Sequence, residues 1–479
     1  MKKRIVSVLL ASIMIFGMAG CSSGNSVEGN IEVSGTDTIQ NESTQEDVSE
    51  ENSNIVGITE DGLPIYGEKV ELVIWGGVPA ENGPQEVIDN YNELNKERNV
   101  EIQYYRYTND DNGNISLDTA LMAGEKMDMF ISYTPSRRDT RIQSGKVMDI
   151  TEICEKLDID LVRDFGSLAE DNIVDDKVYS IPTMKYMDLI VYNKDMLDEK
   201  GLPVPTQDST WEDVRELLNQ TKTEDVYGML LNTNGDFFIQ PFVSTANKSP
   251  VPYMNEDGSV AWNSNPQFKE AYQFVYDMMY QDQCVMDWPT MLAEKINEGN
   301  KADIMFLNGQ ASSIFTGTQI IRNIIDRETY PHDFVTAFAP VPKFDAEQNE
   351  YYASVQSNDH ISVNVNCEYP EEAVRYIKWY ATEGYDPMIE NGRLPLYQNY
   401  DADRAYEIMI GENTDLIDAE SFKNTVFGQY DDFNSPLTDE NKATVSKISK
   451  EESEAYFLDQ ISLDEMLDNM QTRTEELVK

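Results

Sequence analysis

Residues 178–214, VYSIPTMKYMDLIVYNKDMLDEKGLPVPTQDSTWEDV, decide how the rest of the chain is read. The apolar runs 178–181 and 189–192 predict two short strands, because the first run is followed by a proline, which cannot donate to a β-ladder. Thr210 and Asp213 have the spacing of a capping box, which predicts a helix start. The stretch therefore predicts a strand, a turn, a second strand, a linker and an amphipathic helix.

Three motifs of this stretch resemble those of bacterial extracellular solute-binding proteins, the capture subunits of ATP-driven sugar importers. They are Tyr192-Asn193-Lys194-Asp195, Gly201-Leu202-Pro203 and Thr210-Trp211-Glu212-Asp213. In that family, the strand before the first motif carries the chain from one lobe to the other. The resemblance implies an α/β fold of the two-lobed periplasmic-binding-protein type, also called a Venus flytrap, with hinge crossovers.

Further pieces of the family's pattern follow in the family's order over residues 70–479. They lie at 72–75, 123–131, 144–150, 306–317, 363–380 and 392–395. The resemblance implies a first lobe of residues 67–186 with 342–396 and a second lobe of residues 187–341 with 397–479. A ligand would be enclosed between the lobes, and closure would be a population shift towards the liganded state.

The N-terminus reads as a lipoprotein signal peptide of residues 1–20. Three basic residues precede an apolar run at 5–18 that is too short to span a membrane comfortably. Met18-Ala19-Gly20-Cys21 resembles a lipobox, which implies lipidation of Cys21 with acyl chains such as palmitate; a plain signal peptide is the alternative. Residues 21–66 are polar and acidic and predict a disordered tether.

Composition limits the partners of the protein. The formal net charge of −50 excludes nucleic acid as a partner and disfavours a strongly anionic ligand. Once Cys21 is lipidated, Cys154, Cys284 and Cys367 remain, which is an odd number and indicates no disulfide framework. We expect a monomer that is anchored by its lipid on the extracytoplasmic face of the cell membrane.

Alternating strands and helices open the folded part. Apolar β-type runs at 70–75, 100–105 and 128–132 are separated by helical patterns, which predicts a largely parallel sheet. Ligands of such sheets bind beyond the carboxyl ends of the strands, so the loops after Trp75 and Ser132 are expected at the site. Further along the chain, 304–306 reads as another short strand.

Sugar rings present apolar faces and hydroxyl edges, so a sugar site needs aromatic rings together with polar groups. The resemblance implies ligand contacts in the loop after the third strand, at the crossing between the lobes and in a second-lobe stacking pair. A further candidate lies behind a Gly-containing turn, where this chain departs from the Trp that a family member stacks on its ligand. These candidates, in that order, are Tyr133, Ser136 and Arg137, then Tyr186, then Phe237 and Phe238, then Gln319. Trp75, Gly77 and Asp359 are further candidates, although a Trp that closes a buried strand is more often a core residue.

Three functions compete on the sequence alone. The first is capture of a neutral saccharide for an ABC permease, without catalytic residues, metal or cofactor. The second is binding of another ligand, such as a polyamine or peptide, by the same fold. The third is a surface glycan-degrading enzyme, but the chain lacks a Gly-x-Ser-x-Gly elbow and a His-Glu-x-x-His motif, and has only His332 and His360.

Overall fold

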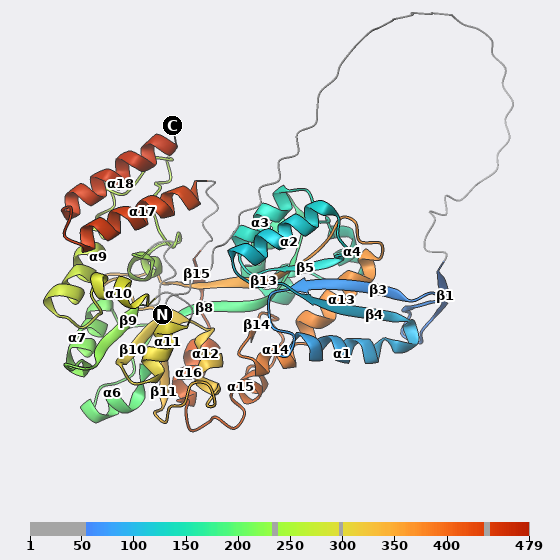
Figure 1. Ribbon diagram of the computed structural model, residues 1–479, viewed down its shortest axis with the longest axis horizontal. Helices are drawn as coiled ribbons and strands as arrows, with labels where there is room; N and C mark the ends of the chain where they lie inside the picture. Colours follow the sequence, from blue (N-terminus) through green and yellow to red (C-terminus); the bar gives the residue numbers. More distant parts are fainter. Residues whose placement is uncertain (1–53, 232–237, 297–299, 435–440, 479) are drawn as a thin grey trace, which may run out of the picture. The chain divides into compact units, whose positions relative to one another are not determined.

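The computed structural model describes residues 54–231, 238–296, 300–434 and 441–478. Contacts group residues 54–479 into one compact unit. Its central sheet has nine strands, and most of its buried apolar side chains form one continuous core. Two sets of elements, called here the first and second lobes, are joined through this sheet (Figure 1).

The first lobe is built on the three strands that the sequence predicts to be parallel. β3 (Val70–Gly76) lies between β4 (Val100–Arg106) and β5 (Met129–Ser132), and both neighbours run parallel to it. β13 (Val355–Val363) is antiparallel to β5 and extends this sheet. The helices of this lobe are α1 (Pro84–Leu94), α2 (Asp111–Ala123), α3 (Pro135–Gln143), α4 (Thr151–Lys156), α5 (Leu161–Phe165), α13 (Pro370–Thr382) and α14 (Asp386–Glu390).

One long strand joins the lobes. β8 (Ile181–Asn193) pairs first with β13 and β14 (Leu394–Pro395), and then with β10 (Ala311–Gly317) and β11 (Thr336–Pro340). The prediction of two separate strands is therefore wrong at Pro182, which lies inside β8 opposite His360. A single missing N–H does not end a strand whose other residues are paired on both sides.

The second lobe continues the sheet with β10 and with β9 (Tyr227–Leu231), which is parallel to β10. The predicted capping box is confirmed at the start of α7 (Trp211–Thr221). Residues 304–306, predicted as a strand, lie in the helix α11 (Lys301–Leu307), because an apolar run of three residues does not distinguish the two structures. The other helices are α6 (Lys194–Lys200), α8 (Gln240–Val243), α9 (Pro266–Tyr276), α10 (Trp288–Glu294), α12 (Ile320–Ile325), α15 (Ala402–Ile410), α16 (Ala419–Val426), α17 (Lys442–Phe457) and α18 (Leu463–Leu477).

Two strands lie before residue 67, the expected start of the first lobe. β1 (Ile55–Ile58) and β2 (Pro64–Tyr66) form an antiparallel hairpin within the stretch that the composition assigned to the tether. Tyr66 is buried, and its hydroxyl donates to Oε1 of Glu372 in α13 at 3.1 Å. One aromatic side chain with a buried carboxylate partner thus holds the hairpin against the first lobe.

Candidate functional site

A row of half-buried polar side chains marks the place where β8 leaves the first lobe. Tyr186 and Asp188 are two residues apart in β8, so they lie on the same face of the sheet. Gln356 of β13 is opposite Tyr186 in the register, and Ser354, which precedes β13, contacts Asp188. These four residues, called here the polar row, are partly exposed, whereas the intervening Met187 is buried.

Gly317 forms the floor beside the polar row. It ends β10 opposite Asp188, and a Cβ added to it would lie 1.9 Å from the Tyr186 hydroxyl and 2.4 Å from Oε1 of Gln319. The absence of a side chain therefore lets these two polar groups converge on one point. Nε2 of Gln319 donates to Oγ1 of Thr316 at 3.2 Å, whereas its Oε1 is buried and has no hydrogen-bond partner among the residues that the structure describes.

Asp188 places a carboxyl group beside Gly317, because the two residues are opposite each other in the register. Ser354 donates its hydroxyl to Oδ2 of Asp188 at 2.6 Å, and the Asp188 N–H donates to the Ser354 carbonyl at 3.0 Å. Burial raises the pKa of the Asp188 carboxyl to about 6, although the bond from Ser354 acts in the opposite direction. Burial, and to a lesser extent the Asp188 charge, also raises the pKa of Tyr186 above its ordinary value.

The carboxyl edge of the first-lobe sheet contributes a second group of candidates. The backbone N–H of Gly77 donates to the Tyr133 hydroxyl at 2.7 Å, and burial raises the pKa of that hydroxyl well above its ordinary value. Trp75 is the penultimate residue of β3 and stacks on the exposed ring of Tyr105, with ring centroids 4.0 Å apart. Its indole Nε1 has no hydrogen-bond partner within the described residues.

Asp359 is held in a different environment. Asp359 is buried in β13, whereas Gln356 of the polar row is partly exposed on the same strand. Oδ2 of Asp359 accepts a hydrogen bond from Nε of Arg393 at 3.1 Å. The neighbouring Gly392, at φ +76°, lies against α12 of the second lobe, where an added Cβ would be 3.1 Å from the backbone nitrogen of Arg322. This buried ion pair therefore positions a segment that touches the other lobe.

A match to a known protein family shows which family the chain belongs to. Residues 79–387 match the family of bacterial extracellular solute-binding proteins. The chain belongs to this family. The family and the structures that resemble this chain are binding proteins, and the recognition made from the sequence motifs is confirmed.

Solved structures confirm the two-lobed fold of this solute-binding protein. It resembles a sugar transporter from Rhizobium etli in an open conformation, with 19% identity and a TM-score of 0.67 over 85% of this chain and 99% of that one. It also resembles an ABC substrate-binding protein from Listeria monocytogenes in complex with cycloalternan, with 17% identity and a TM-score of 0.66 over 85% of this chain and 99% of that one. A maltose-bound protein from T. maritima has 16% identity and a TM-score of 0.63, over 85% of this chain and 100% of that one.

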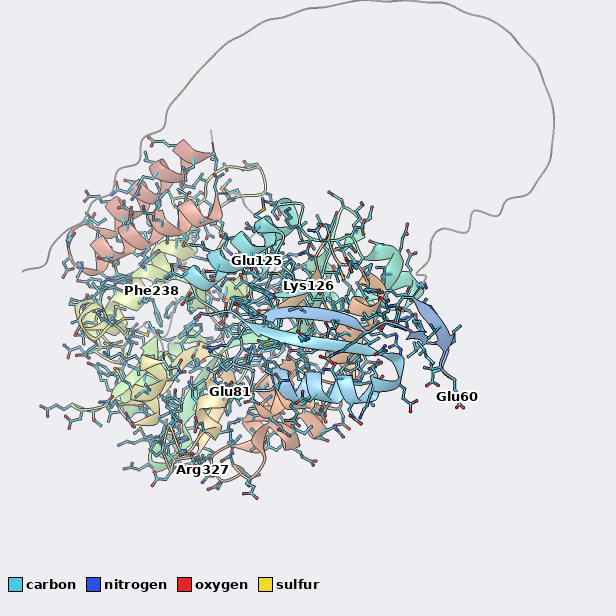
Figure 2. All side chains as sticks on the ribbon, turned by 45° about the vertical axis from the view of Figure 1, so that its right-hand side comes forward. Glu60, Glu81, Glu125, Lys126, Phe238 and Arg327 are labelled. Atoms are coloured by element: carbon cyan, nitrogen blue, oxygen red, sulfur yellow. The ribbon has the colours of Figure 1, made fainter. Side chains whose placement is uncertain are left out.

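The remaining sequence candidates of this solute-binding protein lie apart from the polar row. Ser136 is exposed in the first turn of α3, and Arg137 forms an ion pair of 3.0 Å with Asp111. Phe238, which Figure 2 labels, is 4% exposed. Its ring packs edge-on against Trp288 and Phe457 of the second lobe. A packing role accounts for Phe238, whereas Phe237 and Cys21 lie outside the described residues.

The structure thus brings together Tyr186 with Gln319, and Gly77 with Tyr133. Sequence reasoning missed Asp188, Ser354 and Gln356. One signal was present, since Asp188 is a lone carboxylate between Met187 and the apolar run that follows it. The contact between Ser354 and Asp188 could not be predicted, because it joins residues 166 positions apart.

The described ranges hold neither a metal-binding cluster nor a helix fit to cross a membrane. Within them, no group of three or more His, Cys, Asp or Glu side chains could hold a metal ion. No described helix combines the length and the apolar composition that crossing a membrane requires. Cys154, Cys284 and Cys367 are free thiols and all three are buried.

Proposed function

We propose that this solute-binding protein captures an oligosaccharide between its lobes and delivers it to the permease of an ABC importer. The observation that carries the proposal is the convergence of two polar groups around Gly317, namely the hydroxyl of the partly exposed Tyr186 and the buried Oε1 of Gln319, which has no hydrogen-bond partner among the described residues. Buried polar groups are normally hydrogen-bonded, so an unpaired amide oxygen beside a hydroxyl favours a ligand with polar partners for both. The hydroxyl edge of a sugar supplies such partners.

The first lobe would supply the other side of the ligand. Trp75 combines an aromatic ring with an unpaired N–H at the carboxyl edge of the sheet, where ligands of α/β sheets bind. Tyr133 and Gly77 lie at the same edge. A ligand that contacts this edge and the polar row at once would stabilise the closed arrangement of the lobes.

Membrane attachment is the second part of the proposal. Lipidation of Cys21 would place residues 22–53 between the lipid and the first described strand, and would hold a monomeric protein on the extracytoplasmic face. Replacement of Cys21 by Ala is expected to release the protein from the cell surface into the medium, as measured by immunoblotting of membrane and medium fractions. An equal membrane fraction for the variant would contradict the anchor.

The state of Asp188 favours one alternative to a sugar, namely a cationic ligand. No ion pair of the described residues includes Asp188, so a cation such as a polyamine would find an unneutralised carboxylate there. Turnover by a surface enzyme is a further alternative. An oligosaccharide recovered unchanged after long incubation with the protein supports binding, whereas released monosaccharide indicates hydrolysis.

Thermal unfolding of the full chain tests the ligand class. Maltotriose, cellotriose, xylotriose, spermidine and a tripeptide are each added in excess. A ligand at 100 times its dissociation constant adds about 2.7 kcal/mol to the free energy of unfolding. We expect one trisaccharide to raise the midpoint, and Y186F and Q319A to reduce that rise, while Y276F, a control in α9 whose hydroxyl donates to Asp459, retains it. A rise with spermidine or the peptide alone would overturn the sugar.

A further inference from the structure

Asp188 has a carboxylate oxygen that the fold leaves unused. Ser354 occupies Oδ2, but Oδ1 has no hydrogen-bond partner within the described residues. The carboxylate belongs to no ion pair of the described ranges. A partly buried carboxylate with neither a cation nor a full set of hydrogen bonds is costly, because desolvation is not offset.

The surroundings of Asp188 explain why no described residue neutralises its charge. The titratable group nearest to Asp188 along β8 is Tyr186. On the adjoining segment, the residue that contacts Asp188 is Ser354, which is uncharged. On the other side it faces Gly317, which has no side chain. Asp303 of α11 acts on Tyr186 and adds a further negative charge to the region.

These groups are arranged as hydrogen-bond acceptors for one ligand. Oδ1 of Asp188 and Oε1 of Gln319 both accept, and the Tyr186 hydroxyl can donate or accept. Gly317 is common to all three, since it is opposite Asp188 in the register and lies under the other two. Two acceptors and a hydroxyl around one residue match neighbouring hydroxyl groups on one sugar ring.

We propose that Asp188 is a ligand-binding residue whose ionised carboxylate accepts a hydrogen bond from one of two neighbouring hydroxyls of the bound saccharide. This inference rests on the proposed function and adds to it a residue and a dependence on pH. A hydrogen bond to a charged acceptor is about twice as strong as one to a neutral acceptor. Affinity should therefore fall as the carboxylate becomes protonated.

The test uses D188N in the full chain. Asn keeps an oxygen that accepts from Ser354, so the fold is retained, but it removes the charge. The probe is the trisaccharide among maltotriose, cellotriose and xylotriose that raises the wild-type unfolding midpoint. We expect the wild-type dissociation constant to rise about tenfold per pH unit below pH 6, and D188N to bind at least tenfold more weakly at pH 8 with a flat pH profile. D61N, an exposed control, should match wild type.

Two results would overturn the inference separately from the proposed function. Equal affinity and an equal pH profile for D188N and wild type would remove Asp188 from the site while leaving saccharide capture intact. A D188N protein that unfolds below the wild-type temperature without ligand at pH 8 would make the carboxylate a structural group, whatever the ligand. We expect D188N to unfold at or above the wild-type temperature, because the variant removes an uncompensated charge. This measurement needs no ligand, so it tests whether the carboxylate is structural even if none of the trisaccharides binds.

Discussion

A small substitution at Gly317 is expected to alter the candidate site directly. In G317A, the new methyl group would occupy the space now held by the Tyr186 hydroxyl and Oε1 of Gln319. Both are ends of side chains, so they can move, and we expect the fold to survive. Binding of the saccharide should weaken by about tenfold or more, or about 1.4 kcal/mol, as measured by calorimetry.

The matched control for this change is Gly145, at φ +69°, where an added Cβ meets nothing within 4 Å. G145A should bind saccharide with wild-type affinity although its positive φ makes the backbone strained. If G317A also binds with wild-type affinity, Tyr186 and Gln319 do not define the site.

Asp188 also predicts how the stability of the unliganded protein depends on pH. Its pKa in the folded protein, about 6, is above the ordinary value, so the folded state holds this proton more tightly than the unfolded state. The free energy of unfolding contributed by this group should therefore fall as pH rises from about 4 to 6, by about 1–3 kcal/mol. Denaturant unfolding of wild type and D188N across this range measures the difference. Identical curves would contradict it.

A buried ion pair gives a prediction about stability alone. Arg98 and Glu372 are bonded to each other, and their side chains are 5% and 2% exposed. E372L leaves Arg98 buried without its partner and should lower the free energy of unfolding by about 3–5 kcal/mol. The double variant R98M/E372L should recover part of this loss, because no charge is then stranded. A double variant less stable than E372L would show that packing, rather than charge, dominates there.

At the scale of elements, the β1–β2 hairpin sets the start of the folded unit. A form beginning at residue 67 loses the buried Tyr66 and the Pro64 carbonyl, which accepts from Nε of Arg98 at 3.1 Å. Burial of the ring and a bond to a carboxylate are each worth about 1.5–3 kcal/mol. A form beginning at residue 54 should therefore unfold several degrees higher than one beginning at 67. Equal unfolding midpoints would make the hairpin dispensable.

Local signals in the sequence predicted the elements that depend on local chemistry. The capping box of α7 and the strands β3, β4 and β5 follow from spacing and apolar runs of adjacent residues. The continuity of β8 through Pro182 did not, because it depends on pairing with β13 and β10, which are distant in the sequence. The same limit applies to the polar row, whose members meet only through strand pairing.

At the scale of the whole molecule, the motif order predicted the family and the two-lobed fold. Within it, the predicted ligand residues fall into groups at the crossing and at the carboxyl edge of the first-lobe sheet, with others such as Phe238 in the core. A resemblance fixes which strand crosses between lobes, but the identities of the polar side chains around the ligand differ with each ligand. Those identities have to be taken from the structure.

Hydrogen exchange measured with and without the saccharide that raises the unfolding midpoint tests capture at the crossing most directly. We predict that the ligand slows exchange in β8 around Tyr186 and Asp188, at Gly317, and in the segment that carries Ser354 and Gln356. Exchange on the outer helices α17 and α18 should stay unchanged. Protection confined to elements away from β8, with a ligand that still raises the midpoint, would place the site elsewhere and contradict the proposal.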